Sequence, residues 1–166
     1  MDVFDEELLN LWKCLNENNV RYIMVGGVAT NLHGYQRSTE DIDLWLEDNV
    51  KNRKNLRKAL KEYGLGDFEP IERIKFLPGW TDFYLNSGMR LDIMTKMKGL
   101  EDIGFNECLQ KAMVAEISTI QVPFLHINQL IQNKEAVNRP KDQLDVIYLR
   151  KILEIQEENE SKSTGA

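Results

Sequence analysis

The order of apolar and polar residues divides the first part of the chain into helix, strand, helix and strand. Apolar side chains recur at helical spacing near its start, and they are Phe4, Leu8, Leu11, Trp12 and Leu15. This spacing predicts an amphipathic helix that ends near residues 18–19. Apolar runs over residues 21–25 and 41–46 predict two strands, and a short helix between them is expected to begin at Gly26 and Gly27.

A longer helix and a hairpin follow. Asp48 is placed to cap a helix that runs to Tyr63 and is closed by Gly64. Residues 81–85 and 89–95 are extended segments on either side of an Asn-Ser-Gly turn, which predicts a β-hairpin. The two halves of this hairpin are expected to pair antiparallel to each other.

The pattern weakens in the later part of the chain. Residues 103–112 predict a helix, and residues 118–122 predict a short strand that the following Pro123 confines to the edge of a sheet. Residues 128–137 predict another helix, which carries Lys134.

A final helix is predicted over residues 141–155, with Pro140 suited to its first turn. Apolar side chains at helical spacing form its expected packing stripe, and they are Leu144, Ile147, Tyr148, Ile152 and Ile155. Residues 156–166 are polar and lack periodicity, which predicts a disordered tail.

Together these elements predict an α+β fold in which a mixed β-sheet is flanked by helices. The first strand leads through a helix to the second, and the hairpin adds antiparallel pairing, so the sheet is not expected to be purely parallel. A chain of 166 residues has the size of one domain and can bury a real core. We therefore expect a single domain over residues 1–155, followed by the tail.

Composition and charge narrow the class of protein without naming a partner. The formal net charge of −6 gives no chain-wide support for nucleic-acid binding. Cys14 and Cys108 lack the spacing of metal ligands or of a disulfide framework, and both are expected to be buried thiols of a reducing compartment. The start of the chain does not have the pattern of a signal peptide, and no apolar run approaches the ~20 residues that span a bilayer. We therefore expect a soluble, cytoplasmic protein with no membrane partner.

One helix face between residues 51 and 61 is strongly basic. Its cationic side chains are Lys51, Arg53, Lys54, Arg57, Lys58 and Lys61. Such a face is compatible with a polyanion-binding role, but a solvated helix surface is the simpler interpretation and the one we favour.

Two acids within the second predicted strand are the first candidates for chemistry. Side chains alternate across a strand, so Asp41 and Asp43 project from one face while Ile42 and Leu44 project from the other. Adjacent carboxylates repel each other, and a divalent cation such as magnesium or manganese would relieve that repulsion. The alternative is an exposed edge strand whose two acids have no function.

The paired glycines shift the balance toward a phosphate site. Gly26 and Gly27 close one strand and open a helix, and a backbone without side chains lets a phosphate approach its N–H groups. Glycines followed within one helix by Asp-x-Asp on the next strand form a more specific pattern than either feature alone.

The run from Val25 to Leu44 resembles the nucleotidyltransferase superfamily with the DNA-polymerase-β-like fold, in particular its small bacterial branch that includes AbiEii-type toxins. That resemblance implies a third strand carboxylate, and Asp92 supplies it. The segment from Asn138 to Asp145 is also similar, so that the match spans about residues 20–153. Many superfamily members have serine where this chain has Gly27, which removes a hydroxyl contact but leaves the backbone turn.

The resemblance implies a reaction and the residues that carry it out. Asp41 and Asp43 would ligate one or two Mg²⁺ or Mn²⁺ ions that bridge a nucleoside triphosphate, while Asp92 would complete the metal site and act as base toward an acceptor hydroxyl. The nucleoside monophosphate would pass to that acceptor with release of pyrophosphate. The alternative for Asp92 is a strand acid that pairs with Arg90 or a nearby lysine.

Further residues are candidates for nucleotide binding, and they are Gly26, Gly27, Arg37, Thr39, Lys134 and Lys141. A guanidinium, a hydroxyl or an ammonium group at these positions could contact phosphate oxygens. The alternatives are a turn residue for Arg37, a strand cap for Thr39 and an ordinary helix junction for the lysines. His33 is interpreted as a packing residue rather than a catalytic one.

Two functions from different classes remain open. The first is an active transferase, ATP-binding or otherwise, whose acceptor is a small molecule, a protein or a tRNA. The second is a binding or regulatory module with little catalysis, of the kind found in toxin–antitoxin pairs. The chain has little room for a substrate-recognition domain, so acceptor selectivity would need a second copy, and a homodimer is retained as an option.

Overall fold

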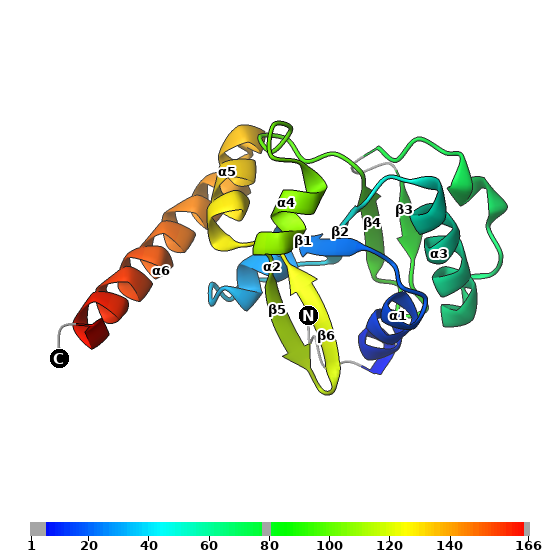
Figure 1. The fold of residues 1–166 in the computed structure, drawn as a ribbon, viewed down its shortest axis with the longest axis horizontal. Coiled ribbons are helices and arrows are strands. Elements are labelled where there is room, and N and C mark those ends of the chain that lie inside the picture. Colours follow the sequence, from blue (N-terminus) through cyan, green and yellow to red (C-terminus); the bar gives the residue numbers. More distant parts are fainter. Residues whose placement is uncertain (1–5, 78–80, 165–166) are drawn as a thin grey trace.

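A computed structural model describes residues 6–77 and 81–164 of the chain (Figure 1). The strands form one sheet, and they are β1 (Tyr22–Val25), β2 (Asp41–Leu46), β3 (Asp82–Tyr84), β4 (Arg90–Met94), β5 (Met113–Ile117) and β6 (Ile120–Phe124). Their order in this six-stranded sheet is β3-β4-β2-β1-β6-β5. β1 is antiparallel to β2 and parallel to β6, while β2 is parallel to β4. The predicted α+β fold with a mixed sheet is therefore confirmed.

Helices lie on the sheet and beyond its ends. They are α1 (Glu6–Glu17), α2 (Gly26–Leu32), α3 (Val50–Leu60), α4 (Gly104–Lys111), α5 (Ile127–Val137) and α6 (Pro140–Thr164). In Figure 1, α1 and α3 lie together at one end of the molecule, and α5 and α6 lie together at the other. None of the described helices is long and apolar enough to cross a membrane.

The core follows the alternation that the sequence predicts for the strands. Ile42 and Leu44 on β2 are fully buried, as are their neighbours Leu91 and Ile93 on β4. Asp41 and Asp43 therefore project from the opposite face of the same strand. Cys14 and Cys108 are buried free thiols, as predicted.

The helix after β2 begins one residue later than predicted. Asn49, rather than Asp48, caps α3, because the Asn49 side chain accepts a hydrogen bond from the Asn52 backbone N–H at 2.8 Å. Asp48 instead forms an ion pair with Arg53. The predicted closure at Gly64 falls in a π-helical turn over Lys61–Leu65, where Gly64 has a φ of 113°.

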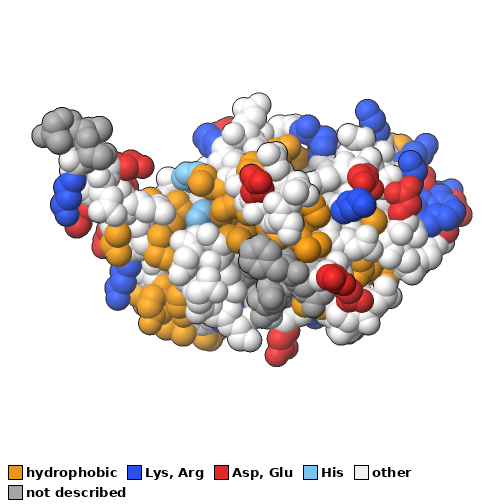
Figure 2. Space-filling model, turned by 90° about the horizontal axis from the view of Figure 1, so that it is seen from below, with side chains coloured by type: hydrophobic (Ala, Val, Ile, Leu, Met, Phe, Trp, Pro, Cys, Tyr) orange, Lys and Arg blue, Asp and Glu red, His pale blue; other side chains and the backbone are white. Residues whose placement is uncertain are grey.

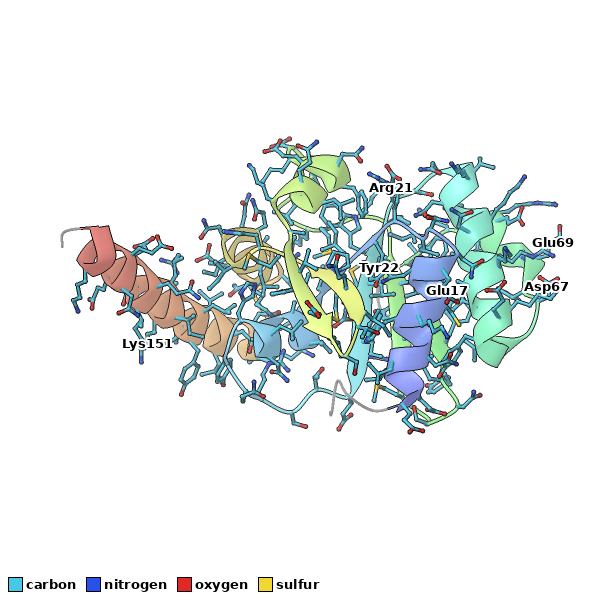
Figure 3. All side chains as sticks on the ribbon, turned by 60° about the horizontal axis from the view of Figure 1, so that its bottom comes forward. Glu17, Arg21, Tyr22, Asp67, Glu69 and Lys151 are labelled. Atoms are coloured by element: carbon cyan, nitrogen blue, oxygen red, sulfur yellow. The ribbon has the colours of Figure 1, made fainter. Side chains whose placement is uncertain are left out.

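The basic face of α3 is largely neutralised by nearby acids. Arg57 forms ion pairs with Asp67 and Glu72, and Lys61 also lies within 3.2 Å of Asp67. Figure 3 labels Asp67 beyond α3, at the end of the molecule opposite to Lys151 on α6. These pairs support the interpretation of the basic face as a solvated helix surface.

The edge of the sheet differs from the prediction. Residues 118–122 were expected to form a strand, but Ser118 and Thr119 make the turn between β5 and β6. β5 was missed, and β6 continues through Pro123. Proline is tolerated in β6 because the pairing of this strand with β1 is confined to Met24 and Phe124.

The packing of α6 also differs from the prediction. Leu144, Ile147, Tyr148 and Ile155 are exposed, and Figure 2 shows hydrophobic side chains grouped at the end of the molecule where α6 lies. The buried positions of α6 are Asp142, Asp145 and Leu149 instead. The predicted stripe was wrong because buried ion pairs, described below, take the inner face of this helix.

The segment 156–164, for which the sequence predicted disorder, continues α6 as helix. Its side chains from Gln156 to Lys162 are all exposed. Glutamate, glutamine and lysine favour helix without needing a packing partner, so a polar segment can extend an existing helix where no apolar stripe is present.

Candidate functional site

A cavity of about 400 Å³ opens where β2 and β4 meet α2, α5 and the start of α6. Every residue that the sequence assigned to the site lines this cavity, namely Gly26, Gly27, Arg37, Thr39, Asp41, Asp43, Asp92, Lys134 and Lys141. The fold therefore brings together residues that are more than a hundred positions apart in the chain.

The acids come from two neighbouring strands. Asp43 on β2 lies directly across from Asp92 on β4, and Asp41 is one alternation earlier on the same face. Burial, together with the charges of Asp41 and Asp92, raises the pKa of Asp43 to about 6, while the charges of Lys141 and Lys134 act in the opposite direction. Burial is the largest of these causes, and the two neighbouring acids add to it.

Asp41 has a cationic partner on the adjacent strand. Arg90 occupies the position on β4 directly across from Asp41, and its Nη2 donates to Asp41 Oδ2. The sequence offered Arg90 as an alternative partner for Asp92, whereas in the structure the Arg90 guanidinium pairs with Asp41. Arg90 was not predicted as a site residue, although its spacing of two from Asp92 places both side chains on one face of the strand.

The two glycines are required by close packing. Gly26 has a φ of 64°, and a Cβ at this position would overlap Oδ2 of Asp43. A Cβ on Gly27 would lie 2.5 Å from Oγ1 of Thr39. The side chains of Asp43 and Thr39 already occupy the space where these Cβ atoms would lie, so the glycines let the start of α2 pack directly against both side chains.

Arg37 and Thr39 lie on the segment that leads into β2. Arg37 donates through Nε and Nη2 to the two carboxylate oxygens of Asp145, at 2.8 and 2.9 Å. The Thr39 hydroxyl donates to the backbone carbonyl of Asp41 at 3.2 Å. Both residues therefore have structural partners and at the same time line the cavity.

The opposite wall is built from cations held by the buried aspartates of α6. Lys134 Nζ lies 2.6 Å from Asp145 Oδ2 and 3.8 Å from Asp142 Oδ1, and Lys134 is only 3% exposed. The pKa of Lys134 is lowered by burial, and the nearby carboxylates of Asp145 and Asp142 oppose that shift only in part. Arg139 donates through Nε and Nη2 to the two carboxylate oxygens of Asp142, at 2.7 and 3.1 Å. Asp142 and Asp145 thus fix three cations along one side of the cavity.

Lys141 differs from these cations. It is exposed, and within the described ranges no carboxylate lies within 4.0 Å of its ammonium group. It therefore offers the cavity a positive charge that is not already paired.

Sequence reasoning missed several residues of the cavity wall. They are Arg90, Met94, Lys96, Met97, Lys98, Asn133, Val137 and Arg139. The alternation of β4 could have found Arg90 and Met94, which lie two positions before and after Asp92 on the same strand. The residues from α5 had no such signal, because they reach the cavity only through tertiary packing.

The fit of this site to a divalent cation depends on Asp41. Three carboxylates on one face supply the hard oxygen ligands that magnesium and manganese prefer. Within residues 6–77 and 81–164, however, no group of three or more His, Cys, Asp or Glu side chains is arranged to hold a metal ion. Asp41 is paired with Arg90 in this structure. The three carboxylates are suitable ligands for a divalent cation if Asp41 leaves that pair.

His33 lies outside the cavity lining. Its ring packs 5.0 Å from the ring of Phe124, and Nε2 lies 2.8 Å from the carbonyl oxygen of Leu125. Burial lowers its pKa. These contacts agree with the interpretation of His33 as a packing residue.

Solved structures of similar fold are nucleotidyltransferases or resemble them. The lincosamide antibiotic adenylyltransferase LnuA, solved with lincomycin bound, aligns with a TM-score of 0.58 at 17% identity over 89% of this chain and 97% of LnuA. An antigenic nucleotidyltransferase-like protein from Paracoccidioides brasiliensis aligns with a TM-score of 0.54 at 17% identity, over 87% of this chain and 72% of that protein. A candidate nucleotidyltransferase from Thermotoga maritima aligns with a TM-score of 0.54 at 19% identity, over 89% of this chain and 90% of that protein.

At these identities the alignments establish the fold and no more. No curated protein matches the chain in sequence. A family model does match, over residues 3–156, and its description is "Nucleotidyltransferase of unknown function" (DUF6036). The chain therefore belongs to this family of the nucleotidyltransferase superfamily.

Proposed function

We propose that the protein is a metal-dependent nucleotidyltransferase that moves a nucleoside monophosphate from a nucleoside triphosphate to a hydroxyl acceptor. Membership of the family supports nucleotidyl transfer in general. The observation that carries the proposal is one cavity in which Asp41, Asp43 and Asp92 face a wall of cations. A triphosphate is attracted by the cations but repelled by the carboxylates, so it can approach the carboxylates only if a divalent cation lies between them.

Asp41, Asp43 and Asp92 would hold magnesium or manganese. When bound, a divalent cation neutralises the triphosphate and stabilises the attacking and leaving oxygens. The placement of Asp43 directly across from Asp92, with Asp41 on the same face of β2, supports this assignment.

The remaining groups of the cavity would bind and orient the phosphates. Gly26 and Gly27 line the cavity and would bring the start of α2 close to the phosphates, with the side chains of Asp43 and Thr39 packed directly against them. Lys141 would contact the phosphates directly, since its ammonium group is exposed and unpaired among the described residues. The nucleotide site would be completed by Arg37, Thr39 and Lys134. Asp145 holds the side chains of Arg37 and Lys134 in place, so both would present positive charge to the phosphates.

Asp92 would take the proton of the acceptor hydroxyl. The acceptor oxygen then forms a bond to the α-phosphorus while the bond from that phosphorus to the bridging oxygen breaks, and pyrophosphate leaves with the electron pair. A carboxylate suits this role because it is held on a strand of the sheet and lines the cavity.

A binding or regulatory module, as in a toxin–antitoxin pair, would need the fold but not the acids. The convergence of three carboxylates on one cavity favours the transferase. LnuA, by its name, adenylylates a lincosamide antibiotic, and the present chain covers 97% of its structure. A domain of this size is thus sufficient for a small acceptor, although a protein or a tRNA end fits the same chemistry.

The test is a transfer assay with α-labelled nucleoside triphosphates, cell extract as the source of acceptors, and magnesium. We expect label to appear in a product together with pyrophosphate, and both to be lost in a D41A/D43A double variant. The matched control is D82N, since Asp82 lies across from Asp92 on β3 but does not line the cavity. No transfer, combined with no magnesium-dependent nucleotide binding by calorimetry, would overturn the proposal.

A further inference from the structure

We propose that Arg90 is an internal counter-cation, which holds Asp41 in the metal-free protein and is displaced when a divalent cation binds. This inference rests on the proposed function, because it assigns Asp41 to the metal site. Arg90 then acts as a positioning residue that competes with the metal for one carboxylate.

The competition follows from the register of the two strands. Asp41 and Arg90 occupy directly facing positions on the parallel strands β2 and β4. Neighbouring strands are about 4.8 Å apart, so facing side chains meet without any rearrangement of the backbone. The guanidinium contacts Oδ2 of Asp41, which is an oxygen that a metal ion would use. Two cations at one carboxylate oxygen repel each other, so the metal and Arg90 exclude one another there.

The exposure of the pair allows the exchange. The side chains of Arg90 and Asp41 are 38% and 26% exposed, so water reaches both partners. Partly exposed ion pairs contribute little net stability, because the separated charges are well solvated. The Arg90 guanidinium can therefore leave Asp41 for solvent at a small cost.

The other arginines and lysines with acidic partners at the cavity are held differently. Arg37 and Lys134 pair with Asp145, and Arg139 pairs with Asp142, where each carboxylate is only 1% exposed. Breaking those pairs would leave a buried charge without compensation. Within the described part of the chain, Arg90 is thus the cation whose partner is both accessible and a proposed metal ligand.

The competition predicts opposite effects for the metal-free and the metal-bound protein. Removal of Arg90 takes a positive charge away from Asp41, Asp43 and Asp92, so the metal-free protein should lose stability. The same change frees Asp41, so the metal should bind more tightly. A purely structural role for Arg90 would produce the first effect without the second.

The experiment measures Mn²⁺ binding in the absence of nucleotide, by electron paramagnetic resonance of the free ion, for wild type and R90M. We expect R90M to bind Mn²⁺ about five- to tenfold more tightly than wild type, as expected if an exposed ion pair no longer has to be broken. Its melting temperature should be lower than that of wild type without metal and should rise by a larger amount when Mn²⁺ is added.

Two further variants separate competition from general charge. K96M removes a cation that lines the same cavity from the segment after β4, whereas the ion pair with Asp41 is made by Arg90. It should tighten Mn²⁺ binding less than R90M does. R90K keeps a cation at the position but loses the fork of the guanidinium, so its affinity should lie between those of wild type and R90M.

The failure of this inference is distinguishable from that of the proposed function. If wild type binds Mn²⁺ and D43N does not, but R90M binds no more tightly than K96M, the competition is refuted and the metal site stands. If neither wild type nor R90M binds Mn²⁺, with or without nucleotide, the metal-dependent function itself is refuted. Tighter binding by R90M, intermediate binding by R90K and a small effect of K96M would support both.

Discussion

The Arg37 guanidinium forms a bidentate ion pair with the Asp145 carboxylate, with N–O distances of 2.8 and 2.9 Å. The two residues are 108 positions apart in the chain. Asp145 also accepts a hydrogen bond from the buried Lys134 ammonium group at 2.6 Å. One carboxylate on α6 therefore orients two cations of the cavity wall, and the geometry of the site depends on the docking of that helix.

Substitution of Asp145 by asparagine should be strongly destabilising. Arg37 and Lys134 would lose a carboxylate that is 1% exposed, and Lys134 would remain as a buried charge. We expect the free energy of unfolding to fall by about 3–5 kcal/mol, measured by urea denaturation. The control is E135Q in the exposed pair with Arg150, which should change stability by less than about 1 kcal/mol. Equal unfolding midpoints for the two variants would contradict the structural role of Asp145.

Substitution of Gly26 by alanine should damage the site beyond the backbone effect. Gly26 and Gly88 both have positive φ values, 64° and 83°, but a Cβ at Gly88 meets no atom within 4 Å. Both variants should lose about 1–2 kcal/mol from the left-handed backbone. G26A should lose about 1–3 kcal/mol more, because its methyl group overlaps Asp43. Thermal unfolding of the two variants measures this difference. Similar losses of stability in G26A and G88A would show that Asp43 does not pack closely against Gly26.

Substitution of Asp92 by asparagine should separate binding from chemistry. If Asp92 takes the acceptor proton, D92N should reduce turnover by a factor of ~10² or more while calorimetry with magnesium and nucleotide shows nearly unchanged binding. D41N and D43N should impair both, since Asp41 and Asp43 would ligate the metal that bridges the triphosphate, whereas Asp92 would complete only the second metal. D82N, on the facing strand, serves as the control. A D92N enzyme with near-normal turnover would assign Asp92 a structural role only.

His33 should make stability depend on pH. Burial lowers its folded pKa below the usual 6.5, so the unfolded state binds the proton more readily. The contribution of neutral His33 is therefore complete above pH 6.5 and is lost as the pH falls below that value. H33Q, whose amide can still donate to the Leu125 carbonyl, should show a shallower loss of stability between pH 6.5 and 5. Urea denaturation of wild type and H33Q at several pH values across this range measures the difference in slope.

The strands that carry the acids could be predicted because local signals agree there. Residues 41–44 alternate between acids and apolar side chains, residues 45 and 46 are also apolar, and the observed β2 has the predicted bounds. The hairpin turn is a short-range signal and placed Asp92 on a strand, whereas its role as a third carboxylate was implied by the resemblance to the superfamily; in the structure Asp92 lies directly across from Asp43.

The rest depended on contacts between distant residues. β5 was missed because its side chains are mostly exposed, so hydrophobic periodicity carries no signal for it. The inner face of α6 was misassigned because Asp142 and Asp145 are buried only by virtue of Lys134, Arg37 and Arg139. A hydrophobic pattern cannot show that a charged residue will find a partner far away in the chain.

The pairing of Arg37 and Lys134 with α6 also has a consequence for the order in which the site is made. Chains fold from the N-terminal side as they are synthesised, at ~5–20 residues per second. Asp41, Asp43 and Asp92 leave the ribosome several seconds before Asp145, at that rate. A nascent chain that ends at residue 137 already contains the acidic strands but not the carboxylates that orient the cationic wall. The cationic wall of the cavity is thus completed late in synthesis, when α6 packs against α5 and brings Asp142 and Asp145 to Lys134, Arg37 and Arg139.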